Sequence, residues 1–121
     1  MQVQVHADET IQGGDSLAQW VTEEINNRLA RLKEYVQRVE VYLTGVDALK
    51  STGGPGKRCV LETRANGRPP IAVNAEAEKV QEAIALAVDK LLRAVETDLG
   101  KLKDKNGRES VRGVEAAADE E

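Results

Sequence analysis

Residues 38–44, RVEVYLT, alternate between polar and apolar side chains without interruption. A period of two residues is typical of a β-strand that buries one face, so Val39, Val41 and Leu43 are predicted to point into a core. The same alternation occurs at residues 2–6, QVQVH, and predicts a strand there as well.

Two further strands are expected later in the chain, at about residues 58–65 and about residues 70–74. Asn66 and Gly67 lie between them and favour a tight turn, because both residue types tolerate positive φ. The connector that precedes residues 58–65 is rich in glycine and is expected to be a loop.

Apolar residues at helical spacing occupy the segments on either side of these strands. Ser16 begins a possible capping box, so a helix is predicted to start there and to continue along an apolar stripe that ends near Val36. A second helix is predicted from about Ala75, capped by Asn74, to about Lys103.

The resulting order β-α-β-β-β-α predicts an α+β fold: a two-layer sandwich with a four-stranded mixed sheet and two helices packed on one face. The first two strands should be parallel, because a helix connects them, and the last three should form an antiparallel meander. Residues 1–105 are expected to form one domain. Residues 106–121 are expected to be a flexible acidic C-terminal tail, because the apolar pattern is lost there.

Composition argues against several classes of function. The 121 residues are 40% hydrophobic and 31% charged, and no apolar run is long enough to cross a bilayer, so a cytoplasmic protein is expected. Cys59 and His6 are the only cysteine and histidine, which leaves no disulfide, no plausible metal site and no nucleophilic triad. Residues 53–58 do not match a P-loop, because Arg58 stands where Ser or Thr would hold Mg²⁺. No enzymatic activity, no metal and no cofactor are expected.

The net charge of −4 resides in the C-terminal segment. Of 21 acidic and 17 basic residues, residues 109–121 hold five acidic and one basic, so residues 1–108 are neutral. Along the predicted chain directions, basic residues gather at the end where both helices finish, and acidic residues gather at the other end. The predicted basic end contains Arg28, Arg31, Lys33, Arg38, Arg64, Arg68, Arg93, Lys101, Lys103 and Lys105. Such a concentration of cations is typical of surfaces that bind nucleic-acid phosphates.

Two segments carry a resemblance to a known family. The first, RLARLK at residues 28–33, ends the first predicted helix. The second lies in the other helix and contains AI at residues 83–84, DKL at 89–91 and LGKLKDK at 99–105. Together with the element order, about residues 1–108 resemble the bacterial ribosome hibernation-promoting factor and ribosome-associated inhibitor family.

The resemblance implies a cytoplasmic, non-enzymatic protein that binds the small ribosomal subunit in its decoding channel. Basic residues of both helices would meet the ribosomal RNA backbone, and the bound protein would block the mRNA and tRNA positions of idle ribosomes. The matching positions are Arg28, Arg31, Lys33, Lys90, Lys101, Lys103 and Lys105. The positions that follow from the predicted topology alone are Arg38, Arg64, Arg68 and Arg93. A monomer in solution is expected, with no membrane partner.

A second hypothesis is a diverged protein–protein interaction module with little or no ribosome affinity. Its binding surface would be the acidic end together with the acidic tail, or the exposed face of the sheet, which is predicted to contain Gln4, His6, Arg38, Glu40, Tyr42, Glu62 and Arg64. The two hypotheses differ in whether the basic residues form one contiguous patch or are neutralised locally by Glu34, Glu96, Asp98 and Asp104.

Overall fold

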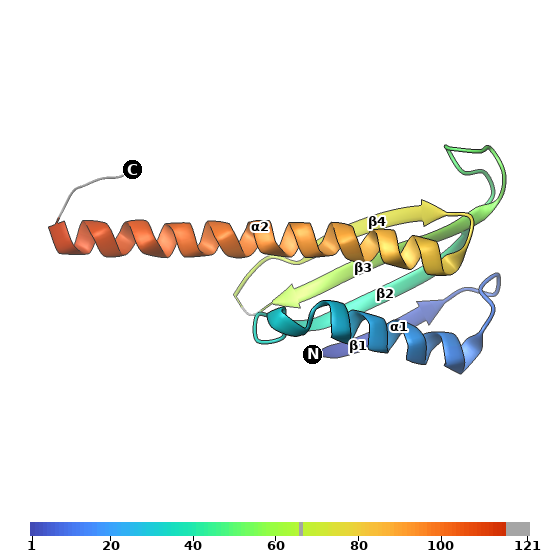
Figure 1. Ribbon diagram of the computed structural model, residues 1–121, viewed down its shortest axis with the longest axis horizontal. Helices are drawn as coiled ribbons and strands as arrows, with labels where there is room; N and C mark the ends of the chain where they lie inside the picture. Colours follow the sequence, from blue (N-terminus) through green and yellow to red (C-terminus); the bar gives the residue numbers. More distant parts are fainter. Residues whose placement is uncertain (66, 116–121) are drawn as a thin grey trace.

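The computed structural model describes the backbone of residues 1–65 and 67–115 and the side chains of residues 1–64 and 67–101. The elements along the chain are β1 (Gln2–Ala7), α1 (Gly14–Arg28), the short 3₁₀ helix η1 (Ala30–Leu32), β2 (Val36–Val46), β3 (Gly56–Ala65), β4 (Ile71–Ala77) and α2 (Val80–Glu115). This is the predicted order β-α-β-β-β-α (Figure 1).

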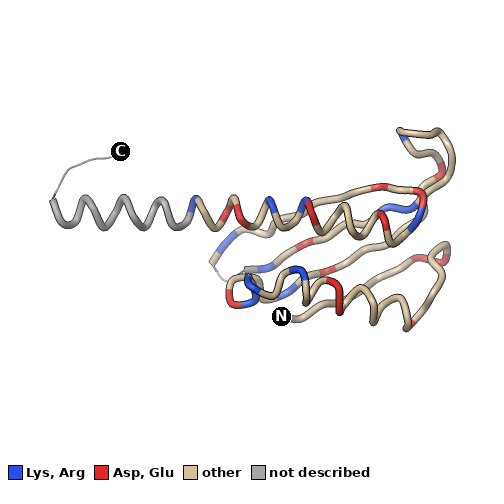
Figure 2. Tube along the Cα trace, viewed as in Figure 1, with Lys and Arg blue, Asp and Glu red and all other residues tan. Residues whose placement is uncertain are grey.

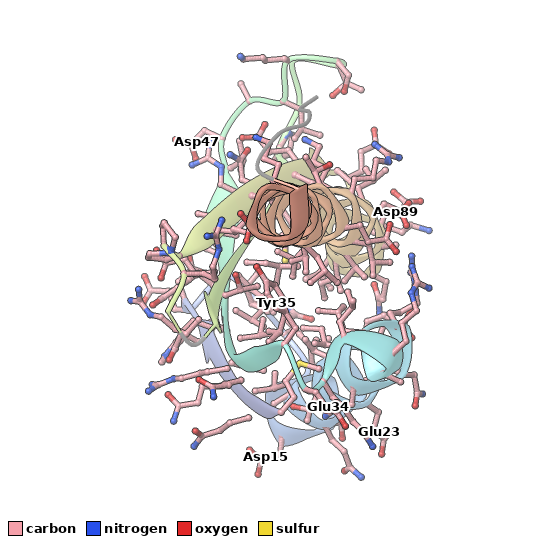
Figure 3. The ribbon with its side chains drawn as sticks, turned by 90° about the vertical axis from the view of Figure 1, so that its left-hand side faces the viewer. Asp15, Glu23, Glu34, Tyr35, Asp47 and Asp89 are labelled. Atoms are coloured by element: carbon pink, nitrogen blue, oxygen red, sulfur yellow. The ribbon has the colours of Figure 1, made fainter. Side chains whose placement is uncertain are left out.

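The four strands form one mixed sheet in the order β1-β2-β3-β4. β1 is parallel to β2, and β2, β3 and β4 are antiparallel neighbours, which confirms the predicted α+β topology. α1 packs chiefly on β1, and α2 packs on β3 and β4, so both helices cover the same face of the sheet (Figure 3). The opposite face carries no second layer in the part of the chain that the structure describes.

The core lies between the sheet and the helices. Alternate residues of the two central strands are fully buried, as the period of two predicted, and they include Val39, Val41, Leu43, Cys59 and Leu61. The helices contribute the matching apolar stripes, with Ile25 of α1 and Leu91 of α2 among the fully buried side chains. Burial of apolar surface of this kind is the dominant stabilising term of a small domain.

Both predicted helix starts are wrong. α1 begins at Gly14 after Gly13, whose φ of 116° is a left-handed conformation that favours glycine, and no side chain caps the helix. Asn74 caps nothing, because β4 continues to Ala77 and Asn74 pairs with Val60 of β3. The pairing of β4 with β3 is a tertiary contact that outweighs the local preference of Asn74 for a helix start.

Both predicted helix ends also differ from the structure. α1 stops at Arg28, and the chain tightens into η1 before β2 begins at Val36. α2 does not stop near Lys103 but continues to Glu115, so it extends well past the sheet (Figure 1). Loss of the apolar stripe does not itself end a helix, and residues 104–115 contain no proline that would stop it. Residues 116–121 lie outside the described part of the chain, and the flexibility of the tail stays a prediction.

Within the described residues, no helix is long and apolar enough to span a membrane.

Candidate functional site

The fold brings several predicted cations to the end of the sheet where α1 finishes. η1, the start of β2, the end of β3 and the β3–β4 turn lie at this end, and α2 passes over it (Figures 1 and 2). We call this region the basic end and define it by Arg28, Arg31, Lys33, Arg38, Arg64, Arg68, Arg93 and Lys101. Lys90 lies elsewhere: its Nζ donates a hydrogen bond to the carbonyl oxygen of Asn74 at 2.8 Å, beside β4.

Ion pairs join the C-terminal end of α1, and η1 after it, to α2. Arg28, the last residue of α1, pairs with Asp89 of α2 and lies 3.7 Å from Glu24 of its own helix. Arg31 of η1 pairs with Glu96, two turns further along α2. Two arginines that were predicted to face RNA therefore also hold the two helices together at this end.

Arg68 takes part in a third link to α2. Its Nη2 and Nε donate hydrogen bonds to the two carboxylate oxygens of Asp98 at 2.7 and 3.2 Å. The hydroxyl of Tyr35 donates to the same carboxylate, and its ring points inward beneath α2 (Figure 3). The Arg68 guanidinium, and next the Tyr35 hydroxyl, lower the pKa of Asp98 below its ordinary value, whereas burial and the Asp98 carboxylate raise the pKa of Tyr35.

A polar cluster lies on the open face of the sheet. Glu40 is 7% exposed, and its carboxylate pairs with Arg38 and lies 2.7 Å from His6 Nε2. Arg38 also donates to Gln4 Oε1 at 3.1 Å, and the rings of His6 and Tyr42 stack with their centroids 4.9 Å apart. The hydrogen bond from His6, and next the one from Arg38, lower the pKa of Glu40. Arg38 therefore already has hydrogen-bonding partners within this cluster. Its cross-strand neighbour on β3 is Arg64.

Four cations of the basic end are exposed and have no carboxylate within ion-pair distance among the described side chains: Lys33, Arg64, Arg93 and Lys101. Lys103 and Lys105 are part of α2, but their side chains lie outside the described residues. The basic end is therefore a mixture of four free cations and four arginines with acidic partners. Glu96 and Asp98 neutralise cations as the second hypothesis anticipated, no ion pair of Glu34 occurs among the described side chains, and Asp104 lies beyond them.

Sequence reasoning missed the partners Asp89 and Glu40 and the role of Tyr35. A register of β1 on β2 would have placed His6, Arg38 and Glu40 near one another, because these strands are neighbours in the predicted sheet. The contacts of Asp89 and Tyr35 depend on how α2 lies across the molecule. Residue spacing in the sequence does not show how α2 lies across the molecule.

The described residues offer little for catalysis or metal binding. No group of three or more His, Cys, Asp or Glu side chains among them is arranged to hold a metal ion. Cys59 is fully buried in the core, and burial raises the pKa of its thiol to about 12. A thiol in this state is not a nucleophile at neutral pH.

Comparison with solved structures shows the same fold in two bacterial proteins. A ribosomal subunit interface protein from Coxiella burnetii superposes with a TM-score of 0.61 at 19% identity, over 86% of this chain and 99% of that one. The N-terminal domain of Protein Y from Thermus thermophilus superposes with a TM-score of 0.58 at 21% identity, over 80% of this chain and 98% of that one. No curated protein matches the sequence. The family described as Sigma 54 modulation protein / S30EA ribosomal protein matches residues 3–105. This match spans most of the chain and agrees with the resemblance of its two basic helix segments, so the protein belongs to this family of ribosome-associated factors.

Proposed function

We propose that this protein is a ribosome hibernation factor that binds the small ribosomal subunit through its basic end and blocks the mRNA and tRNA channel. Family membership over residues 3–105 supports ribosome association. The similar protein from Coxiella burnetii is itself described as a ribosomal subunit interface protein. We also propose that it acts in the cytoplasm, where ribosomes are, that it needs no cofactor, and that the free protein is a monomer.

The observation that carries the proposal is the gathering of free cations from separate elements at one end. Lys33 follows η1, Arg64 is on β3, and Arg93 and Lys101 are on α2. Cations on such a surface release counterions from RNA phosphates when they bind, so the affinity should fall steeply as salt rises. The mechanism requires no catalysed reaction. A rigid domain that occupies the channel sterically excludes mRNA and tRNA.

The ion pairs of the basic end set the expected strength of binding. Arg31 and Arg68 already have carboxylate partners, so an RNA phosphate must compete with Glu96 and Asp98 for them. This observation favours a second candidate, an interaction module with low ribosome affinity. The two candidates make opposite predictions for binding at low salt.

Co-sedimentation with ribosomes on a sucrose gradient tests the proposal. The protein should migrate with the small subunit or the intact ribosome at low salt and should be released as salt rises. The double variant Lys33→Glu/Lys101→Glu should lose this binding while keeping its fold, because both side chains are exposed.

The matched control is Lys50→Glu/Lys79→Glu, which makes the same change in charge at the opposite end of the sheet. This control should still bind. Equal binding by both double variants would reject the basic end as the ribosome surface, and no binding at low salt by the unmodified protein would favour the second candidate.

A further inference from the structure

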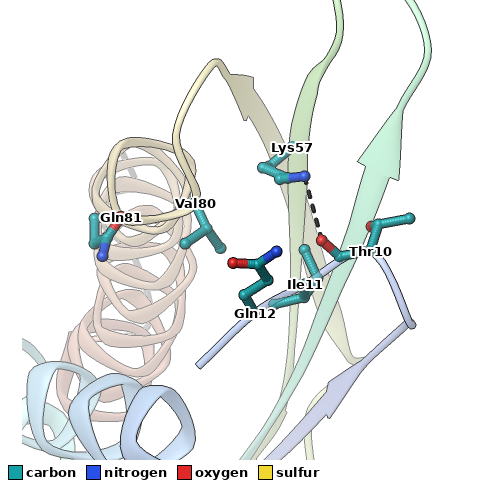
Figure 4. A pocket seen from close by; sticks show the side chains of 6 residues that line it. All are labelled: Thr10, Ile11, Gln12, Lys57, Val80 and Gln81. Atoms are coloured by element: carbon teal, nitrogen blue, oxygen red, sulfur yellow. Dashed lines mark hydrogen bonds between the residues drawn. The ribbon is translucent and has the colours of Figure 1, made fainter. Parts of the chain in front are cut away.

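A hollow of about 430 Å³ lies between the start of α2 and β3, at the end of the sheet opposite the basic end (Figure 4). The side chains around it come from the β1–α1 loop, from β3 and from the first turn of α2, and they are Thr10, Ile11, Gln12, Lys57, Val80 and Gln81. Sites for small molecules have volumes of roughly 300–1,000 Å³, so this hollow is large enough to hold one.

The charge inside this hollow is positive. Lys57 is the only charged residue that lines it among the described side chains, and its Nζ makes one long hydrogen bond, 3.4 Å, to the carbonyl oxygen of Thr10. No carboxylate of the described residues lies within ion-pair distance of Lys57. Asp8 is near, but it does not line the hollow, and its carboxylate accepts hydrogen bonds from the backbone N–H groups of Thr10 and Gly45 at 2.9 and 3.1 Å. The ammonium group of Lys57 is therefore available to an anion.

A second hollow, of about 350 Å³, adjoins the first and is mainly apolar. Leu17 and Trp20 of α1 line it, and the indole ring of Trp20 is 38% exposed. The two hollows share Gln12 and Gln81, so they form one groove between the starts of the helices, which we call the helix-start groove. No acidic side chain lines either hollow among the described residues.

The helix-start groove therefore presents three kinds of group in order: a cation, two side-chain amides and an indole ring. The amides of Gln12 and Gln81 each offer both a donor and an acceptor, as the edges of nucleobases do. An indole ring stacks against planar bases, and an ammonium group binds phosphate. A plain anion would use only Lys57, and an uncharged apolar compound would use only Trp20 and Leu17. A mononucleotide carries a partner for all three kinds of group.

We propose that the helix-start groove binds a mononucleotide. The phosphate would contact Lys57, the edge of the base would bond to the amides of Gln12 and Gln81, and the base would stack on Trp20. The inference does not depend on the proposed ribosome function, because it concerns the opposite end of the molecule from the basic end. A ligand at this place would join the β1–α1 loop to the start of α2.

The single tryptophan of the chain makes a direct test possible. Adenosine monophosphate should quench the emission of Trp20 in a saturable manner, because stacking brings the base into contact with the indole ring. Adenosine, which lacks the phosphate, should bind about tenfold more weakly or worse. Inorganic phosphate should leave the emission unchanged by itself but should compete with adenosine monophosphate when it is in large excess. Equal affinity for adenosine and adenosine monophosphate, or no saturable quenching by the nucleotide, would overturn the proposal.

Variants identify the site by the same measurement of Trp20 emission. Lys57→Met should weaken binding of adenosine monophosphate about tenfold or more, and Lys57→Arg should retain it, because the charge is kept. The matched control is Lys50→Met, which removes the same charge from an exposed residue of the β2–β3 loop and should bind as the unmodified protein does. Equal affinity of Lys57→Met and Lys50→Met would overturn the proposal.

A further variant separates this site from the basic end. The double variant Lys33→Glu/Lys101→Glu, which is expected to lose ribosome binding, should bind adenosine monophosphate with unchanged affinity. Loss of quenching in this variant would show that the nucleotide depends on the basic end and would contradict a site in the helix-start groove.

Discussion

Replacement of Glu96 by glutamine should strengthen RNA binding instead of weakening it. Glu96 pairs with Arg31, and both side chains are largely exposed, at 43% and 67%. An exposed ion pair contributes less than about 1 kcal/mol to stability, so Glu96→Gln should leave the fold intact. The guanidinium of Arg31 is then free to contact a phosphate without first losing its carboxylate partner.

The size of the effect follows from counterion release. Each phosphate contact adds roughly 0.7–0.9 to the slope of log affinity against log salt. If Arg31 gains one contact, a fourfold rise in salt, from about 50 to about 200 mM, should cost the variant about threefold more affinity than it costs the unmodified protein. Glu96→Gln should therefore bind small ribosomal subunits more tightly at low salt and lose part of that advantage as salt rises.

The assay is a salt titration of binding to purified small subunits, and the control is Glu9→Gln. Glu9 is exposed in the β1–α1 loop at the opposite end of the sheet, and its replacement changes the net charge by the same amount. Equal slopes for the two variants would refute the reasoning, because they would show that Arg31 gains nothing specific from the loss of Glu96.

Three further outcomes are expected. Asp98→Asn should lower the free energy of unfolding by roughly 1–2 kcal/mol near neutral pH. Because the pKa of Asp98 is lowered in the folded protein, its stabilisation is fully present above the ordinary value of 3.8 and is lost as pH falls through the lowered pKa, so the melting temperatures of variant and parent should converge in strong acid. Leu91→Ala should cost about 2–5 kcal/mol in urea unfolding, since Leu91 is fully buried, and a smaller loss would mean that the core closes around the cavity. Deletion of residues 109–121 should strengthen nonspecific RNA binding at low salt, as measured by filter binding, because it removes a net charge of −4; unchanged binding would show that this segment does not screen the basic end.

The sheet was predictable because its signal is local and repeated. A one-residue slip would turn Val39, Val41 and Leu43 to the solvent, so the alternation in β2 strongly constrains which face is buried. The helix connection between β1 and β2 then required a parallel pair. Together with an antiparallel meander of the last three strands, these constraints predict the topology that the structure confirms.

The element ends were less predictable, since they depend on competition between local and tertiary preferences. Asn74 suits a helix start, but pairing with Val60 keeps it in β4. At the other end of α2, the loss of apolar residues was interpreted as the end of the helix, although the helix continues to Glu115.

For the candidate site, the sequence was sufficient to place most of the cations at one end but not to tell which of them are free. Arg31 and Lys33 are two residues apart and both are exposed, yet Arg31 pairs with Glu96 of α2 and Lys33 has no ion pair among the described side chains. That difference depends on where η1 lies relative to α2 in the folded molecule, and residue spacing in the sequence does not show this position.

The burial of Cys59 gives this protein an internal reporter of its own opening. Its thiol is the only one in the chain, lies on β3 at the centre of the core and has a pKa near 12. A thiol reagent can therefore modify the protein only in molecules whose helices have separated from the sheet. Under conditions of fast reclosing, the labelling rate measures the fraction of open molecules without any engineered probe. The same measurement with ribosomes present would show by how much binding suppresses that opening.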